Sequence, residues 1–176
     1  MKKIILHILN SNSYSGAEKV VITLIEEMKK ITDEYDFDYV SPNGTIQKLL
    51  IEKSLNFEII SKLSVREIRR VIKKYKPCII HAHDFTASII STFILKNIPI
   101  ISHIHNNSPW LTKYGIKSFA FGLSCLRYKK ILGVSSSILK EYVFGKLIEP
   151  KFQNIGNPID SFKIQYLADG AVDKEE

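Results

Sequence analysis

The sequence predicts one α/β domain, in which a parallel sheet of about six to seven strands carries helices on both faces. Short apolar runs alternate along the chain with longer segments whose apolar residues recur at the helical period. The first pair shows the pattern most clearly, with an apolar run at 4–9 followed by a helical pattern that begins at Gly16. With 176 residues, 45% of them apolar, the chain is long enough to enclose one ordinary core.

The remaining strands and helices are predicted from the same strand and helix periodicities and from the capping residues, prolines and turns that separate them. Thr45 and Ser64 are expected to cap helices, Pro77 ends the second of these, and a loop at 106–113 carries the only tryptophan, Trp110. Strands are expected at 4–9, 35–40, 56–60, 78–83, 99–105, 131–134 and 151–155, and helices at 16–28, 45–53, 65–76, 84–96, 117–128 and 135–144. The alternation of strand and helix patterns ends near residues 156–158. We therefore expect a domain at 1–162 and a linker, or the start of another domain, at 163–176.

Composition indicates an acidic partner and a reducing compartment. The net charge of +7 favours phosphate, nucleotide or an anionic membrane surface over a neutral partner, although plain solubility would also account for it. Cys78 and Cys125 are far apart in apolar surroundings and are expected to be buried, reduced thiols. The first apolar run is too short for a signal peptide, and no run of about 18 apolar residues is present, so a cytoplasmic protein is expected.

Two surfaces suggest contact with lipid or with an acceptor. The helix at 65–76 is amphipathic, and its basic side could lie on an anionic membrane or simply face solvent: Arg66, Arg69, Arg70, Lys73 and Lys74. Four aromatics gather between a loop and the following helix, with core packing the expected use of the last two: Trp110, Tyr114, Phe119 and Phe121. No nucleic-acid partner is expected.

Polar residues collect where the predicted strands end. In parallel sheets, ligands bind beyond the carboxyl ends of the strands. These ends carry 10–16 after the first strand, the paired histidines His81 and His83 with Asp84, the second pair His103 and His105 with Asn106, then Ser135 and finally Asn157. Gly16 lacks a Cβ, so a ligand could approach its backbone closely at the N-terminus of the first helix, where anions are favoured.

Three readings of the histidine pairs remain open. The pairs could meet in a metal site, but no cysteine or acidic cluster beyond Asp84 completes a ligand set. His81 and His103 lie deeper in their strands and are expected to be hydrogen-bonded core residues. His83 and His105 come last, and His105 could hydrogen-bond a substrate or stabilise a developing charge.

Several common catalytic and nucleotide-binding patterns are missing from the sequence. The first loop has a single glycine, so it lacks G-x-G-x-x-G, and no G-K-[ST] P-loop or G-x-S-x-G elbow occurs.

Five motifs, in chain order, resemble those of the family-four retaining glycosyltransferases, of the capsular or exopolysaccharide type. Ser15-Gly16-Ala17-Glu18 is similar to their G-G-A-E turn, and the strand 79–83 to D-I-I-H-A-H, with Cys78 in place of Asp. The strand 101–106 resembles V-T-V-H-D, 133–135 resembles their V-S strand end, and 157–160 resembles N-G-V-D with Pro158 in place of Gly.

The resemblance implies a Rossmann-like, acceptor-side N-terminal half of a GT-B fold. It implies that Gly16 approaches a donor diphosphate, that His105 lies beside the transferred sugar, and that no cofactor or divalent metal is needed. The expected site is His105 as catalytic residue, with Ser15, Gly16, Glu18, His83, Asn106, Ser135 and Asn157 binding substrate.

The family's second domain, which holds the nucleotide, has no counterpart in this sequence. We therefore expect half of an enzyme that moves a hexose, with retention, from a nucleoside diphosphate sugar to a glycan or lipid-linked acceptor in cell-surface polysaccharide synthesis. Such a half is expected to be inactive alone and peripheral on the inner face of the cell membrane. The alternatives are a non-catalytic acceptor-binding or membrane-recruiting subunit that docks with a separate catalytic chain, and a flavodoxin-like binding protein.

Overall fold

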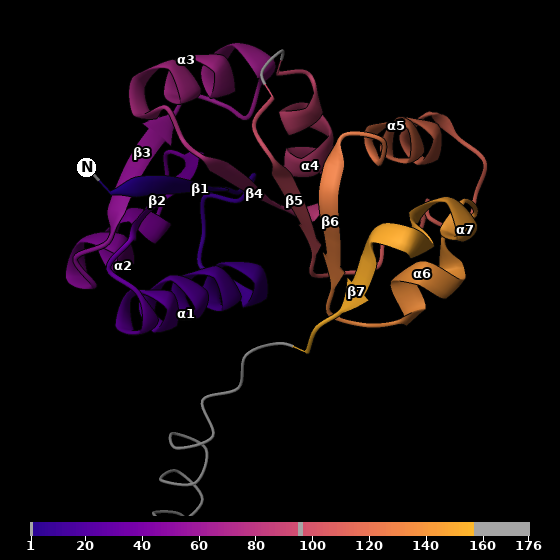
Figure 1. The fold of residues 1–176 in the computed structure, drawn as a ribbon, viewed down its shortest axis with the longest axis horizontal. Helices are drawn as coiled ribbons and strands as arrows, with labels where there is room; N and C mark the ends of the chain where they lie inside the picture. Colours follow the sequence, from indigo (N-terminus) through magenta and orange to yellow (C-terminus); the bar gives the residue numbers. More distant parts are fainter. Residues whose placement is uncertain (1, 95–96, 157–176) are drawn as a thin grey trace, which may run out of the picture.

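A computed structural model describes residues 2–94 and 97–156 of the chain. Within them, seven strands form one sheet in the order β3-β2-β1-β4-β5-β6-β7, and every neighbouring pair is parallel (Figure 1). The strands are β1 (Lys3–Ile8), β2 (Tyr35–Pro42), β3 (Asn56–Ile60), β4 (Ile79–His83), β5 (Ile100–Ile104), β6 (Tyr128–Gly133) and β7 (Phe152–Asn154). The predicted fold class is confirmed.

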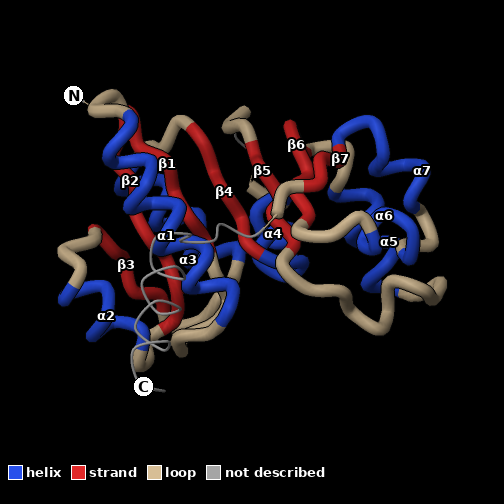
Figure 2. Tube along the Cα trace, turned by 90° about the horizontal axis from the view of Figure 1, so that it is seen from below, coloured by secondary structure: helices blue, strands red, loops and turns tan. Residues whose placement is uncertain are grey.

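Helices cover both faces of the sheet, because buried strands of a parallel sheet need apolar cover on each side. The helices are α1 (Gly16–Ile31), α2 (Ile46–Glu52), α3 (Val65–Tyr75), α4 (Asp84–Thr92), α5 (Ile116–Ser124), α6 (Ser137–Glu141) and α7 (Gly145–Ile148), with a 3-10 turn at Glu149–Lys151. Helices α1 and α2 share one apolar core with β2, and α3, α4 and α5 share a larger core with the central strands. Figure 2 shows α5, α6 and α7 gathered at the β7 end of the sheet.

The central strands send alternate side chains to these two cores. Leu6 and Ile8 of β1, with Ile80 of β4, enter the core beneath α3, α4 and α5. His7 and His81 lie between these positions in the sequence and therefore point to the opposite face, the face of α1.

Two predicted boundaries were wrong in instructive ways. The helix expected to run to residue 128 ends at Ser124, because Tyr128 is buried and begins β6. In β6, Lys129 is skipped in the pairing with β5, and Lys129 and Lys130 are both exposed. The alternation of buried and exposed residues that marks a strand is therefore interrupted in the sequence. The helix expected at 135–144 is two short helices, since the backbone turns extended at Tyr142.

Other details differ less. Ser64 caps α3 by accepting a hydrogen bond from the backbone N–H of Glu67, as predicted, whereas Thr45 makes no side-chain cap. Cys125 is buried, but Cys78 is only partly so, and both are free thiols. The boundary expected at 162 and the linker at 163–176 lie outside the described residues. No helix in the described part of the chain is both long and apolar enough to cross a bilayer.

The loop between β1 and α1 is held against the turn that follows β2. The Asn12 side chain donates to the backbone oxygen of Asn43 at 3.0 Å, and the backbone N–H of Ile46 donates to the backbone oxygen of Asn12 at 3.2 Å. Gly44 lies between these contacts, and a Cβ at Gly44 would stand 2.2 Å from the Asn12 backbone oxygen. Only glycine fits this close approach of two backbones.

We therefore predict that Gly44→Ala lowers the free energy of unfolding by about 1–3 kcal/mol, since the Asn12 backbone must move to admit a methyl group. The matched control is Gly115→Ala, because a Cβ at Gly115 meets no atom within 4 Å. Urea unfolding of both variants measures the difference, and equal midpoints would contradict the steric argument.

Candidate functional site

A polar cavity of about 460 Å³ opens beyond the carboxyl ends of β1 and β4, as expected for this sheet. Three residues expected in the site line it together: Glu18, His83 and Asn106. The remaining lining comes from the loops after β1 and β5 and from α4 and α5: Leu9, Asn10, Ser11, Asp84, Phe85, Thr86, Ile89, Ile90, Ser108, Trp110 and Lys117.

The turn into α1 places a buried carboxylate at this cavity. Glu18 is 2% exposed, and its Oε2 accepts hydrogen bonds from the backbone N–H of Ser15, at 3.0 Å, and from the Ser15 hydroxyl. This pairing satisfies the start of the helix and fixes the carboxylate near the strand ends. Gly16 is the first helical residue and has open space where a Cβ would be. Ser15 and Gly16 thus support the cavity without lining it.

A sharp turn at Asp84 leads from β4 directly into α4. Its φ of 63° lies in the left-handed region, which aspartate tolerates better than most residues. The Asp84 Oδ1 accepts a hydrogen bond from the backbone N–H of His105 at 3.1 Å, which ties the end of β4 to the end of β5. Burial raises the pKa of the Asp84 carboxyl, the His105 hydrogen bond opposes the rise, and the charge of Glu18 adds to it.

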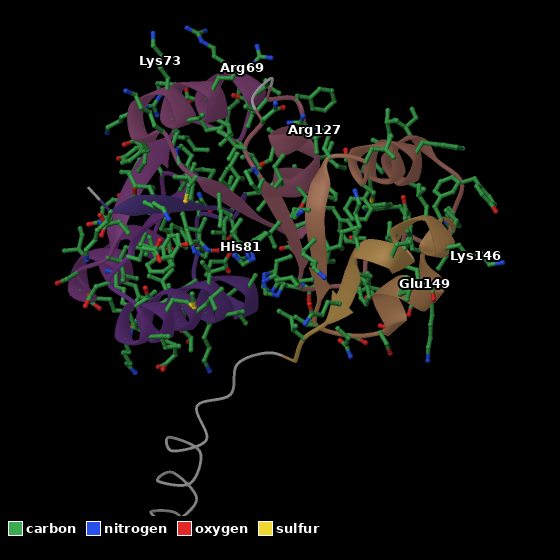
Figure 3. All side chains as sticks on the ribbon, in the orientation of Figure 1. Arg69, Lys73, His81, Arg127, Lys146 and Glu149 are labelled. Atoms are coloured by element: carbon green, nitrogen blue, oxygen red, sulfur yellow. The ribbon has the colours of Figure 1, made fainter. Side chains whose placement is uncertain are left out.

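All five histidines of the chain form one buried ladder on the α1 face of the sheet: His7, His81, His83, His103 and His105. Neighbouring ring centroids lie 4.1–5.4 Å apart. The parallel register produces this stack, because His7 pairs with His81 and His83 pairs with His103 on adjacent strands. Figure 3 shows His81 in the interior of the molecule, between the strands and α1.

A chain of hydrogen bonds runs through three of these rings. The Nδ1 of His7 lies 3.1 Å from the Nε2 of His83, and the Nδ1 of His83 lies 3.0 Å from the Nε2 of His105. Within the described residues, His81 Nε2 and both ring nitrogens of His103 have no hydrogen-bond partner, although both rings are buried. Such atoms are costly to bury.

Burial keeps the imidazoles neutral. It lowers the pKa of His105 to about 4, that of His7 to about 3 and that of His103 to about 2, and it puts the pKa of His81 and His83 well below the ordinary value. Neighbouring imidazoles lower the pKa of His7, His81, His83 and His103 further, whereas the Glu18 charge raises that of His105. Neutral imidazoles accept and donate hydrogen bonds and also ligate metals.

Not every expected site residue reaches the cavity. His105 is 8% exposed and lies one hydrogen bond behind His83, outside the cavity lining. Ser135 bonds Ser137 at 2.8 Å at the end of β6, away from the lining. Asn157 lies outside the described residues. The roles assigned to these residues stay predictions.

The reading of His81 and His103 as hydrogen-bonded core residues was half right, because both are buried but His103 bonds nothing in the described chain. His7 was overlooked. Its signal was available, since His7 alternates with the apolar residues of β1 and this strand adjoins β4 in the usual order of such sheets. Placing β1 beside β4 would have joined His7 to the two pairs.

Three ring nitrogens converge within 4.8 Å of one another in each of two groups, His7 with His81 and His83, and His83 with His103 and His105. A second cavity, of about 360 Å³ and mostly apolar, lies between α1 and the sheet beside His7 and His81. The ladder therefore lies between two hollows.

The two surfaces expected to contact lipid or acceptor, the basic side of α3 and the aromatic segment at α5, differ in how much of them is free for a partner. On α3, Arg70 and Lys74 both pair with Glu58 at 2.6 Å, so part of its basic side is neutralised within the domain. On α5 and the turn that follows it, an apolar stripe is left open to solvent, with exposed fractions of 90%, 58%, 71% and 68%: Ile116, Phe119, Leu123 and Leu126. Phe121 is buried as predicted, but the core position expected for Phe119 was wrong, and Trp110 packs partly buried on Phe85.

Residues 14–161 match the family description "Glycosyltransferase Family 4", which is most of the chain. The chain belongs to glycosyltransferase family 4. Among curated relatives, the UDP-N-acetylglucosamine--N-acetylmuramyl-(pentapeptide) pyrophosphoryl-undecaprenol N-acetylglucosamine transferases of Borreliella afzelii and Borreliella burgdorferi are each 26% identical. Each match covers 80% of this chain and 48% of the relative, so this family 4 domain spans about half the length of the curated relatives it matches.

Solved structures show the same fold. Anabaena HepE in complex with UDP superposes with a TM-score of 0.70 at 15% identity, over 90% of this chain and 44% of that one. A glycosyltransferase from Rickettsia africae superposes with a TM-score of 0.62 at 20% identity, over 97% and 49%. The family 4 domain is thus the N-terminal half of a GT-B fold.

The ladder makes stability depend on pH, and the sign follows from the lowered pKa values. Below about pH 6.5 the unfolded chain protonates its histidines while the folded chain resists until about pH 4 or lower, so the unfolded state binds more protons. We predict that the free energy of unfolding falls with acidification from pH 6.5 towards 4, by up to about 1.4 kcal/mol per pH unit for each histidine. Asp84 and Asp38, whose pKa values are raised by burial, oppose this fall with one proton each. Glu58 adds to the fall, because burial is outweighed there by hydrogen bonds from Lys74 and Arg70, which lower its pKa to about 2.

Urea unfolding in EDTA between pH 7.5 and 4.5 measures this slope. A His105→Gln variant is expected to reduce the slope by about one proton. A pH-independent free energy of unfolding would contradict the buried neutral ladder.

Proposed function

We propose that this family 4 domain is the acceptor-side half of a retaining glycosyltransferase that takes a hexose from a nucleoside diphosphate sugar. The observation that carries the proposal is the family match together with a polar cavity at the carboxyl ends of the central strands. A donor of this class is supported by the HepE structures, which contain UDP or UDP-glucose.

A lipid-linked or glycan acceptor, used in cell-surface polysaccharide synthesis, completes the proposal. The curated relatives are named for transfer to a pyrophosphoryl-undecaprenol acceptor, which combines a sugar, a diphosphate and a lipid. The cavity offers matching groups, with buried Glu18 and exposed Asn106 for hydroxyls and the Trp110 ring for apolar contact with a sugar face.

A second α/β domain is needed for the nucleotide in this proposal. The test is transfer of labelled sugar from a panel of nucleoside diphosphate sugars to lipid-linked acceptors. It is run with this chain alone and with this chain together with the polypeptide encoded next to it. Transfer only with the second polypeptide is expected. Robust transfer by this chain alone would overturn the half-enzyme proposal, and binding of a flavin instead would overturn the reaction class.

Within that reaction, His105 is proposed to stabilise the transferred sugar, with His83 as its partner at the cavity. We predict that His105→Ala lowers kcat of the assembled enzyme by about 10²–10³-fold, in the range found when one stabilising donor is removed. His81→Gln is the control, since His81 is equally buried in the ladder but lines no part of the polar cavity. Circular dichroism confirms folding, and equal kcat values for the two variants would remove His105 from the site.

We also propose that the domain lies on the anionic inner face of the cell membrane through α5 and α7. The open stripe on α5 continues into half-exposed Leu147 of α7, and together they line a groove that is almost entirely apolar. Residues 106–156 carry eight Lys and Arg against two Glu, a charge that suits anionic lipid.

Lysines border this apolar area. Lys113 lies just before α5, Lys117 lies in its first turn at the rim of the polar cavity, and Lys146 on α7 points away from the body of the domain (Figure 3). Arg66, Arg69 and Lys73 of α3, in the same layer of helices, would add attraction, with Arg69 and Lys73 directed outwards in Figure 3.

We predict that Leu123→Glu reduces co-sedimentation with vesicles containing phosphatidylglycerol by about tenfold, because it places a negative charge on the apolar stripe. Ile51→Glu is the matched control, since Ile51 is similarly exposed, at 65%, but lies on α2. Raising the salt concentration should weaken binding of the unchanged chain. Equal loss in both variants, or none in either, would contradict this membrane face.

A further inference from the structure

We propose that His83, His103 and His105 form a binding site for one divalent transition-metal ion, of the Zn²⁺ class. The three residues stand at the carboxyl ends of two adjacent strands and are 1%, 2% and 8% exposed. Three neutral imidazoles are a common protein ligand set for zinc, and they leave a fourth tetrahedral position for a solvent molecule or another ligand.

The spacing of the ring nitrogens suits such an ion. One nitrogen from each ring lies within 4.8 Å of the others, and the Nδ1 of His83 is 3.0 Å from the Nε2 of His105. Zinc–nitrogen bonds of about 2.0–2.1 Å in a tetrahedron put two ligand nitrogens about 3.3 Å apart. The His83–His105 pair is already near that separation, and the His103 nitrogen, which lies within 4.8 Å of both, must approach them to complete the set.

His103 is the residue that the rest of the structure leaves unexplained. Its ring is buried, yet within the described residues neither ring nitrogen has a hydrogen-bond partner. Buried polar atoms without partners are rare and point to an unseen water or ion. A bond from His103 to a metal would satisfy one of these two nitrogens.

His7 supplies an outer contact for the same ion. When the Nδ1 of His83 binds the metal, neutral His83 carries its proton on Nε2 and donates it to the Nδ1 of His7, 3.1 Å away. The proton that now links His83 and His105 moves to the far nitrogen of the ring that holds it, so both ligands stay neutral. The Nδ1 of His105 then carries a proton and no metal, and in the proposed function it is the atom left to donate a hydrogen bond to the transferred sugar. Outer contacts of this kind orient ligating imidazoles and strengthen binding.

Two acidic residues beside the ligands, buried Glu18 and partly buried Asp84, offer the compensating charge that a dication needs. Glu18 is 2% exposed and acts electrostatically on His105, while Asp84 bonds the backbone N–H of His105. In the described chain, neither carboxylate forms an ion pair with Lys or Arg. Both carboxylates act on His105, whereas neither is named among the charges acting on His7 or His81, and we therefore assign the ion to His83, His103 and His105 rather than to His7, His81 and His83.

The test starts from the 176-residue chain stripped of metal with EDTA and titrated with CoCl₂. A tetrahedral imidazole site gives intense visible d–d bands that saturate at one equivalent of Co²⁺, and added ZnCl₂ should displace the signal. All five histidines belong to the ladder, so no surface histidine confuses the result. Weak, octahedral-type absorption that does not saturate, or a thiolate charge-transfer band from Cys78 or Cys125, would overturn the assignment.

Two matched variants then locate the ion. His103→Gln is expected to weaken Zn²⁺ binding by at least 100-fold in calorimetry, while His81→Gln, equally buried in the ladder, should change it less than threefold. The reverse order would move the ion to the other group and overturn this proposal. If His103→Gln does not fold, the rise in Tm with ZnCl₂ decides between the groups: it should persist in His81→Gln, and its loss there would overturn the assignment.

Discussion

The alternation of side chains along three adjacent strands in fixed register is the constraint on which the rest depends. Because β1, β4 and β5 run parallel and pair residue to residue, His7 is opposite His81 and His83 is opposite His103. A one-residue slip of β4 would send its two imidazoles into the apolar core under α3 and α4. The large core on that face, filled by side chains such as Leu6, Ile8 and Ile80, holds the register and so holds the ladder.

Helix α1 covers the histidine ladder and places an acidic side chain beside it. It covers the sheet on the β1 and β2 side, and its first turn delivers Glu18 to the edge where β4 and β5 end. The same turn fixes that carboxylate through Ser15, and the loop before it is pinned at Asn12 against the turn around Gly44. A contact within the turn, between Ser15 and Glu18, and the contacts of Asn12 with the turn at 43–46 thus set the position of one buried charge.

Much of this arrangement follows from the sequence, and the failures have physical causes. The period of two and the helical period give all seven strands, and the polar strand ends give the cavity through Glu18, His83 and Asn106. These patterns do not predict how deeply each side chain is buried. Periodicity says which face a residue takes, but not whether a helix covers that face, so His105 is buried behind the cavity and Phe119 is exposed on α5. The gathering of five imidazoles needs strand order as well, because β1 and β4 are 70 residues apart in the chain but adjacent in the sheet.

The left-handed backbone at Asp84 restricts how this position can diverge among homologous chains. Asparagine tolerates the same conformation and keeps an oxygen for the His105 backbone N–H, but it removes the charge. Glycine keeps the turn and loses both charge and acceptor, and β-branched residues would have to rebuild the junction between strand and helix. We therefore expect aspartate at this position where the negative charge itself is needed, and asparagine where only the shape of the junction is needed.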